Sequence, residues 1–173
     1  WSGIDQLPKG SRVLDVGCGI GGSARILAKD YGFDVTGISI SRAQVLRANQ
    51  LTSSDLSCRF EVMDALDLKF AKGSFDGVWS VEAGPHMPDK QRYADEMLRV
   101  LRPGGVLAVA DWNSREQDYK EMSQFEKFII HQLLTQWAHP SFSSIDSFRK
   151  NLLNSRYCGG EVEIADWTKF TLP

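Results

Sequence analysis

The feature that most constrains the fold is a run of ten residues, Val13–Gly22, near the start of the 173-residue chain. The run begins as an apolar strand, continues as a turn with four glycines in six positions, and leads into a helical pattern. Glycine lets the backbone pass close to a ligand, because it carries no Cβ. The helix that follows points its free N–H groups and the positive end of its dipole toward that gap. The run therefore predicts a strand–turn–helix unit that binds a ligand at its turn.

Strand-like and helix-like segments alternate along the first 110 residues, which predicts βαβ units. We expect an α/β fold of Rossmann-like type, with a doubly wound and mostly parallel sheet. The expected strands are residues 12–16, 34–38, 59–63, 75–80 and 106–110, and the expected helices are residues 22–31, 41–51 and 89–101. In the first of these helices, Ile26 and Leu27 are expected to face the core.

The pattern changes after residue 111, and this change defines the expected domain organisation. Residues 1–111 form the core, and residues 112–160 are too long for a plain crossover, so we interpret them as a helical insertion. The insertion contains helical spacing over residues 122–137 and 144–154. Residues 161–173 are expected to hold a sixth strand, at 161–165, and a truncated end of the core. The chain opens without methionine, and both of its ends are interpreted as truncated.

Composition excludes several classes of function. The chain is 42% hydrophobic with a net charge of −2, which argues against a nucleic-acid-binding face. Its three cysteines match no zinc or disulfide spacing, so we expect no metal and reduced thiols in the cytoplasm. No apolar run is long enough to span a bilayer, and no signal or transit peptide is visible. The composition is that of an ordinary globular domain.

The glycine turn by itself leaves the ligand open. Gly17, Gly19 and Gly22 satisfy the dinucleotide pattern G-x-G-x-x-G, which is weak alone and also fits a nicotinamide or flavin cofactor, or a purely structural turn. Asp15, two residues before the first glycine, changes the interpretation. With it, the segment resembles the first motif of class I S-adenosylmethionine (SAM) methyltransferases. The resemblance implies that Gly17, Cys18 and Gly19 cradle the methionine part of SAM, and that Asp15 holds its ammonium group, often through water.

Polar positions follow each expected strand. In an open α/β sheet, ligands bind outside the carboxyl ends of the strands. Because those ends meet at one edge of a parallel sheet, we expect the five positions to converge on one site. They are Asp15, Ser39, Asp64, residues 80–86 and Asp111.

The end of the second strand departs from the generic pattern, in which an acid holds the ribose. Ser39 stands there, and the segment resembles a methyltransferase subset that includes cyclopropane synthases and tocopherol methyltransferases. The resemblance implies that Ser39, Ile40 and Gln44 serve the ribose and neighbouring groups. Ser41 and Gln44 also read as a helix capping box, and the two interpretations are compatible.

Asp64 and Ala65, after the third strand, resemble the adenine-binding motif of the same enzymes. A carboxylate there accepts from the adenine amino group, and a backbone N–H meets a ring nitrogen. The alternative is a surface acid at the end of a strand.

The segment Val78–Asp89 is the second specific signal. With Gly19–Ser23 it resembles γ-tocopherol and 2-methyl-6-phytyl-1,4-benzoquinol methyltransferases of the cyanobacterial type, and the resemblance covers nearly the whole chain. It implies SAM-dependent C-methylation of the aromatic ring of a prenylated quinol or tocopherol-type phenol. It also implies a small lipid-like partner and peripheral contact with a thylakoid-type membrane.

Ring methylation needs a base, either to deprotonate a hydroxyl or to remove the ring proton afterwards. His86 is the best candidate, and Glu82 is placed to orient it or to meet the substrate hydroxyl. His139 is the rival base, and a backbone-bonded structural role is the alternative for His86. Ser80, in the same segment, is expected to contact the cofactor.

The insertion is the expected site of the lipid tail. The candidate substrate contacts are Trp112, Phe125, Ile129, Trp137 and His139. The alternative for this apolar stripe is plain core. Other activities stay open: an N- or O-methyltransferase on the same fold, or a SAM-binding protein without turnover. A nicotinamide oxidoreductase is opposed by Ser39.

Overall fold

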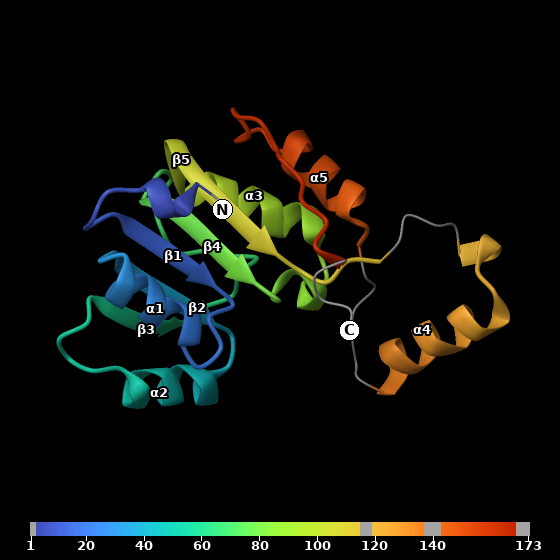
Figure 1. Cartoon of the computed structure of the whole chain (residues 1–173), viewed down its shortest axis with the longest axis horizontal. Helices are drawn as coiled ribbons and strands as arrows, with labels where there is room; N and C mark the ends of the chain where they lie inside the picture. Colours follow the sequence, from blue (N-terminus) through green and yellow to red (C-terminus); the bar gives the residue numbers. More distant parts are fainter. Residues whose placement is uncertain (1–2, 115–118, 137–142, 169–173) are drawn as a thin grey trace.

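The computed structural model describes residues 3–114, 119–136 and 143–168. Its centre is a five-stranded, all-parallel sheet in the order β3-β2-β1-β4-β5 (Figure 1). The strands are β1 Arg12–Val16, β2 Asp34–Ser39, β3 Cys58–Val62, β4 Phe75–Val81 and β5 Leu101–Ala110. The α-helices are α1 Gly22–Asp30, α2 Arg42–Leu51, α3 Lys90–Val100, α4 Gln124–Gln136 and α5 Ile145–Asn154. Three short 3-10 helices are η1 Ile4–Gln6, η2 Gly84–His86 and η3 Tyr119–Glu121.

The sheet is covered on both faces, as the alternating pattern predicts. One core cluster joins β1 and β2 to α1, α2 and η1, and its members include Val13, Leu27 and Phe33. The other cluster lies on the opposite face between the sheet and α3, and includes Val78 and Tyr93. Burial on both faces explains why β1 reads as an almost continuous apolar run. The doubly wound α/β architecture is confirmed.

The strand order shows that the direction of winding reverses in the middle of the sheet, next to β1. From β1 the chain moves outward through β2 and β3, then returns to pair β4 on the other side of β1. The carboxyl ends of β1 and β4 therefore flank the topological switch point, where ligands bind in such sheets.

Helix caps agree with the sequence. The Ser41 side chain accepts from the Gln44 N–H at 3.3 Å, and Asp89 accepts from the Arg92 N–H at 2.9 Å. Ser144 caps α5 in the same manner, by accepting from the Ser147 N–H at 3.0 Å. Each cap satisfies an N–H that has no partner inside its helix.

Three expectations for the fold were wrong in detail. Ile26 is 56% exposed, because the inward stripe of α1 is made by Ala24, Leu27 and Ala28 at helical spacing. The fifth strand begins at Leu101 rather than Val106, with a register irregularity opposite Phe75 and Gly77. Residues 161–165 form no strand, since they have no ladder partner in the part of the chain that the structure describes.

The two helices of the expected insertion differ. Helix α5 packs on α3, where the Gln91 amide donates to the Asn151 carbonyl at 2.9 Å and the rings of Tyr93 and Phe148 lie 6.0 Å apart. Helix α4 lies away from the sheet in Figure 1, although neither helix has a fully buried side chain. The chain leaves and rejoins the body at one place, because Ser114 forms a parallel bridge with Ser144. Within the described residues, no helix is long and apolar enough to cross a bilayer.

Candidate active site

The glycine turn after β1 is tightly packed at two of its glycines and has open space at a third. A Cβ on Gly17 would lie 2.4 Å from the Ala83 Cβ, and one on Gly21 would lie 2.4 Å from the Phe60 ring. A Cβ on Gly19 would meet nothing within 4 Å. All three glycines have positive φ, between 54° and 78°, which L side chains rarely adopt. The turn is thus a cradle whose outer side is free backbone.

Asp15 lies beneath this cradle and is only 1% exposed. Its Oδ2 accepts from the Ser23 hydroxyl at 2.8 Å, and the Ala24 N–H also bonds the carboxylate, so the acid holds the first turn of α1. Burial raises its pKa to about 6, and these hydrogen bonds offset only part of that shift. A cation at this place would relieve the buried charge.

Cys18 contributes backbone rather than thiol to the turn. Its N–H donates to the Ile38 carbonyl at 2.9 Å, which ties the turn to the end of β2. Burial raises the pKa of its thiol to about 12, so the sulfur stays protonated and unreactive.

The end of β2 brings together two of the predicted cofactor residues. The Ser39 hydroxyl donates to Gln44 Oε1 at 2.7 Å and accepts from the Ser41 N–H at 3.2 Å. The Gln44 side chain therefore joins Ser39, rather than returning to the Ser41 N–H as a complete capping box requires. Beside this pair, Ile40 is 75% exposed and offers an apolar surface at the same edge of the sheet.

Asp64 and Ala65 follow β3 at the same edge. Asp64 is exposed, and its Oδ1 accepts from the Leu66 N–H at 2.8 Å, which shapes the loop. Ala65 is 7% exposed and packs in the core cluster under α3. Both residues therefore lie just beyond the carboxyl end of β3, next to the end of β2.

Ser80 is not brought to the ligand side. It is fully buried, donates to the Val16 carbonyl at 2.9 Å, and lies 2.5 Å from the Tyr93 hydroxyl. These partners consume the hydroxyl, so Ser80 joins β4 to β1 and α3 instead of contacting a cofactor directly. The period-two alternation of the strand carried this signal, because neighbouring Val81 and Trp79 point to the other face.

The loop after β4 carries the expected catalytic pair. Glu82 has φ of 56°, unusual for a residue other than glycine, and its Oε1 accepts from Trp112 Nε1 at 3.2 Å. His86 closes η2 and is exposed. The Lys90 ammonium holds η2 by donating to the carbonyls of Gly84, Pro85 and Met87 at 2.6–3.2 Å.

Asp111 is the residue whose role the sequence did not reveal. It directly follows β5, and its Oδ1 accepts from the Gly84 N–H at 3.2 Å. A Cβ on Gly84 would lie 1.9 Å from Asp111 Oδ2, so only glycine fits there. Burial raises the Asp111 pKa to about 6, against the lowering effects of the Gly84 N–H and Lys90. The signal was its position at a strand end, but no spacing showed that it would support the neighbouring loop.

A small, partly open cavity adjoins this loop. It is lined by Gly84, Pro85, Lys90, Asp111, Trp112, Asn113, Ser143 and Phe148. Of the predicted substrate contacts, Trp112 is at this cavity and is 68% exposed. Phe125 and Ile129 are on α4, 72% and 40% exposed. Trp137 and His139 lie outside the described residues.

The backbone and side-chain groups at this edge of the sheet suit the binding of an adenosyl sulfonium. The site offers an open glycine backbone, a buried carboxylate for an ammonium group, hydroxyl and amide groups at β2, and a carboxylate at β3. No cluster of three metal-ligating side chains occurs in the described ranges.

Comparison with known proteins gives consistent matches. The family model described as "Methyltransferase domain" matches residues 14–109. The 2-methyl-6-phytyl-1,4-hydroquinone methyltransferase of Synechocystis is 58% identical over the whole chain, which covers 54% of that relative. The chloroplastic tocopherol O-methyltransferase of Arabidopsis thaliana is 38% identical over 98% of the chain and 49% of the relative. The chain thus spans about half the length of these curated relatives.

Among solved structures, phosphoethanolamine N-methyltransferase 2 of Haemonchus contortus has a TM-score of 0.74 at 25% identity. The match covers 85% of this chain and 33% of that one. That enzyme was solved in complex with phosphomonomethylethanolamine and S-adenosylhomocysteine.

Proposed function

Since this chain belongs to the methyltransferase-domain family, we propose that it binds SAM and methylates a ring carbon of a prenylated quinol or tocopherol-type phenol. The observation that carries the proposal is the contact between the glycine turn and the loop after β4. Gly17 and Ala83 are so close that a Cβ would not fit between them. The residues expected to bind the donor and those expected to act on the acceptor therefore meet at the switch point. The substrate class is supported by the 58% identical relative.

The cofactor residues have separate tasks in this proposal. SAM, when bound, supplies an electrophilic methyl group on a sulfonium. Asp15 neutralises the ammonium of the methionine part, and the backbone of Gly17, Cys18 and Gly19 lies along it. A second group of residues, Ser39, Ile40, Gln44, Asp64 and Ala65, holds the ribose and adenine at the ends of β2 and β3.

The loop after β4 acts on the acceptor. A ring nitrogen of His86 takes the proton, either from a phenolic hydroxyl before transfer or from the ring carbon after it. Glu82, held by Trp112, accepts a hydrogen bond from the other hydroxyl of the quinol. Positioning of donor and acceptor supplies much of the remaining rate enhancement. Asp111 and Lys90 support the loop from beneath.

Lipid-like acceptors extend the proposal to a membrane surface. Helix α4 exposes Phe125, Phe128 and Ile129, an apolar surface that suits contact with a prenyl tail or with a bilayer. We place the protein peripherally on the membrane that holds its acceptor.

The test uses the full chain, labelled SAM, and a panel of phytyl, solanesyl and tail-less quinols together with an amine and a methyl-accepting hydroxyl. Label on a quinol ring carbon is the expected result. Label on the amine or on an oxygen alone would overturn the ring-methylation proposal. SAM binding without any transfer would leave only a binding protein.

The base is tested separately. We expect His86→Ala to bind SAM with unchanged affinity and to lose transfer by about 100-fold or more, a typical effect of removing a general base. His131→Ala is the matched control, because His131 is also exposed but lies on α4. Equal activity of the two variants would reject His86 as the base.

A further inference from the structure

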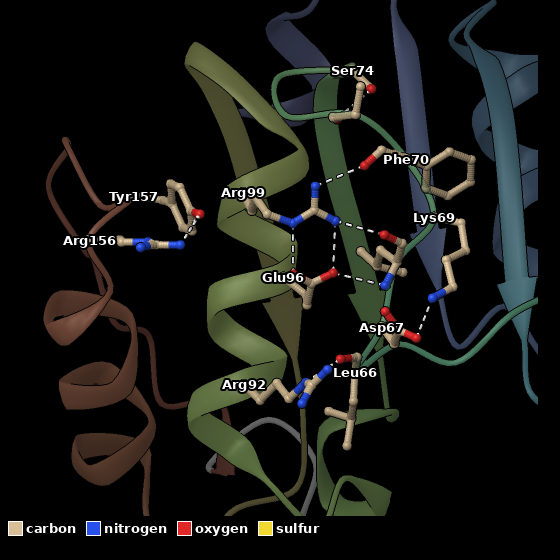
Figure 2. A network of polar contacts seen from close by, with 12 residues as sticks. Leu66, Asp67, Lys69, Phe70, Ser74, Arg92, Glu96, Arg99, Arg156 and Tyr157 are labelled. Atoms are coloured by element: carbon tan, nitrogen blue, oxygen red, sulfur yellow. Dashed lines mark hydrogen bonds and ion pairs between the residues drawn. The ribbon is translucent and has the colours of Figure 1, made fainter.

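One face of α3 carries three charged residues that point at the loop after β3 (Figure 2). Arg92, Glu96 and Arg99 are spaced four and three residues apart, so they follow one another along that face. The loop they meet spans residues 64–70 and begins with Asp64 and Ala65, the proposed adenine contacts.

Arg99 and Glu96 form a two-pronged ion pair. Arg99 Nε lies 2.7 Å from Glu96 Oε1, and Nη2 lies 2.8 Å from Oε2. The side chains are only 20% and 17% exposed, and such fork geometry restricts both partners. Burial raises the pKa of Glu96, but the bonds from Arg99 and the Leu68 N–H outweigh it and the net shift is downward. The same bond raises the pKa of Arg99, so the pair stays ionised.

The pair then grips the backbone of the loop. Glu96 Oε2 accepts from the Leu68 N–H at 2.8 Å, while Arg99 donates to the Leu68 carbonyl and to the Phe70 carbonyl, both at 2.8 Å. Arg92 Nε donates to the Leu66 carbonyl at 2.5 Å (Figure 2). Four backbone groups of the loop are therefore bonded to α3.

Hydrogen bonds within the loop connect the residues held by α3 to Asp64 at the start of the loop. Asp64 accepts from the Leu66 N–H through Oδ1 at 2.8 Å, and its carbonyl accepts from the Asp67 N–H at 3.1 Å. Leu68, bonded on both sides, is 4% exposed and packs in the core. Moving Leu66 or Leu68 would consequently move Asp64 and Ala65.

We propose that Glu96 and Arg99, with Arg92, are positioning residues that hold the adenine-side loop in its binding conformation and so set the affinity for SAM. None of them needs to touch the cofactor. This inference rests on the proposed placement of the adenine at Asp64 and Ala65.

The test measures binding by calorimetry with S-adenosylhomocysteine and with 5′-methylthioadenosine, which keeps the adenosine but lacks the amino-acid part. Arg99→Met removes the guanidinium and keeps the apolar stem. We expect Arg99→Met to lower the affinity for both ligands about tenfold and to raise the KM for SAM. The kcat at saturating SAM should stay nearly unchanged. Arg99→Lys, which can reach one carbonyl, should recover part of the affinity.

Arg59→Met is the matched control. It also removes an arginine from an ion pair, with Asp34 at 3.1 Å, but Arg59 and Asp34 stand at the amino ends of β3 and β2, away from the cofactor edge. We expect its ligand affinities to equal those of the unmodified protein. If Arg99→Met behaves as Arg59→Met does, the inference is overturned.

Two further variants separate the possible failures. Asp64→Asn tests the adenine placement itself: if it leaves both affinities unchanged while Arg99→Met weakens them, the adenine lies elsewhere and the stated mechanism is wrong. Should Arg99→Met fail to fold, Glu96→Gln takes its place with the same expectation for both ligands. A loss confined to S-adenosylhomocysteine would also overturn the inference, because that pattern reports on the amino-acid part.

Discussion

Asp15 is a carboxylate in a buried position, where an ionised side chain is unfavourable for folding. It is 1% exposed, and burial raises its pKa to about 6 from an ordinary 3.8. The folded chain therefore binds this proton more tightly than the unfolded chain does. The associated stability is complete below about pH 4 and is lost as the pH rises through about 6, a change of roughly 3 kcal/mol for a shift of this size. At neutral pH the buried charge costs stability and is kept available for a cation.

Asp15→Asn should remove the loss of stability that ionisation of Asp15 causes at neutral pH. The amide cannot ionise, so its free energy of unfolding relative to the unmodified protein should rise by about 1–3 kcal/mol between pH 4 and pH 7.5. Affinity for S-adenosylhomocysteine should fall, while affinity for 5′-methylthioadenosine should not. Urea unfolding at both pH values and calorimetry check these outcomes. A pH-independent difference in stability would contradict the assignment.

The loop after β4, residues 82–89, called the acceptor loop after its proposed role, needs glycine at position 84 for its close packing. An added Cβ would lie 1.9 Å from Asp111 Oδ2, so either the carboxylate or the loop must move. We expect Gly84→Ala to lower methyl transfer by about tenfold or more and to cost about 1–3 kcal/mol of stability, as overpacking does. Gly159→Ala is the control, because a Cβ there meets nothing within 4 Å. Transfer rates and thermal unfolding of both variants decide the matter.

At the scale of elements, α3 connects the two sides of the site. Lys90 at its first turn bonds three carbonyls of the acceptor loop, and Arg99 at its last turn bonds two carbonyls of the adenine-side loop. Phe148 of α5 packs against Tyr93 in the middle of the same helix. The helix is thus bonded to one loop at its first turn and to the other at its last turn.

Helix α4 has the opposite character, since it buries no side chain. Changing both Phe125 and Phe128 to serine should alter the unfolding free energy by less than about 0.5 kcal/mol, because exposed side chains contribute little to folding. The same change should raise the KM for a phytyl quinol several-fold and weaken binding to lipid vesicles. A tail-less quinol should be unaffected, and Gln136→Ser serves as the control on the same helix. Unchanged vesicle binding would reject membrane contact by α4.

At the scale of the whole molecule, local signals predicted well and non-local ones did not. The turn after β1 and the caps at Ser41 and Asp89 depend on neighbouring residues, so the sequence revealed them. The strand expected at 161–165 alternates correctly, but a strand exists only if another strand pairs with it. The alternation of β4 could show that Ser80 faces away from its two neighbours, but nothing near it in sequence showed that Val16 and Tyr93 would be its hydrogen-bond partners.

The site shows the same division. Ser39 and Asp64 could be placed because they stand at the carboxyl ends of β2 and β3, and the carboxyl ends of parallel strands share an edge. Gln44 could be placed because it lies in the first turn of the helix that follows Ser39. The support beneath them could not be placed, because Arg99 meets Leu68 across 31 positions and Asp111 meets Gly84 across 27.

The position of β1 at the centre of the sheet has a consequence for recombination. The strands on the donor side are consecutive in sequence, from β1 to β3, and those on the acceptor side follow as β4 and β5. Between β1 and β5, the segment after β3 is the covalent link between these two groups of strands. A chimaera that crosses over near residue 73 would inherit its donor pocket from one parent and its acceptor loop from the other. The exchange should succeed where the second parent keeps residues that fit Leu14 and Val16 across the shared core and the charged residues of α3 that hold the loop after β3.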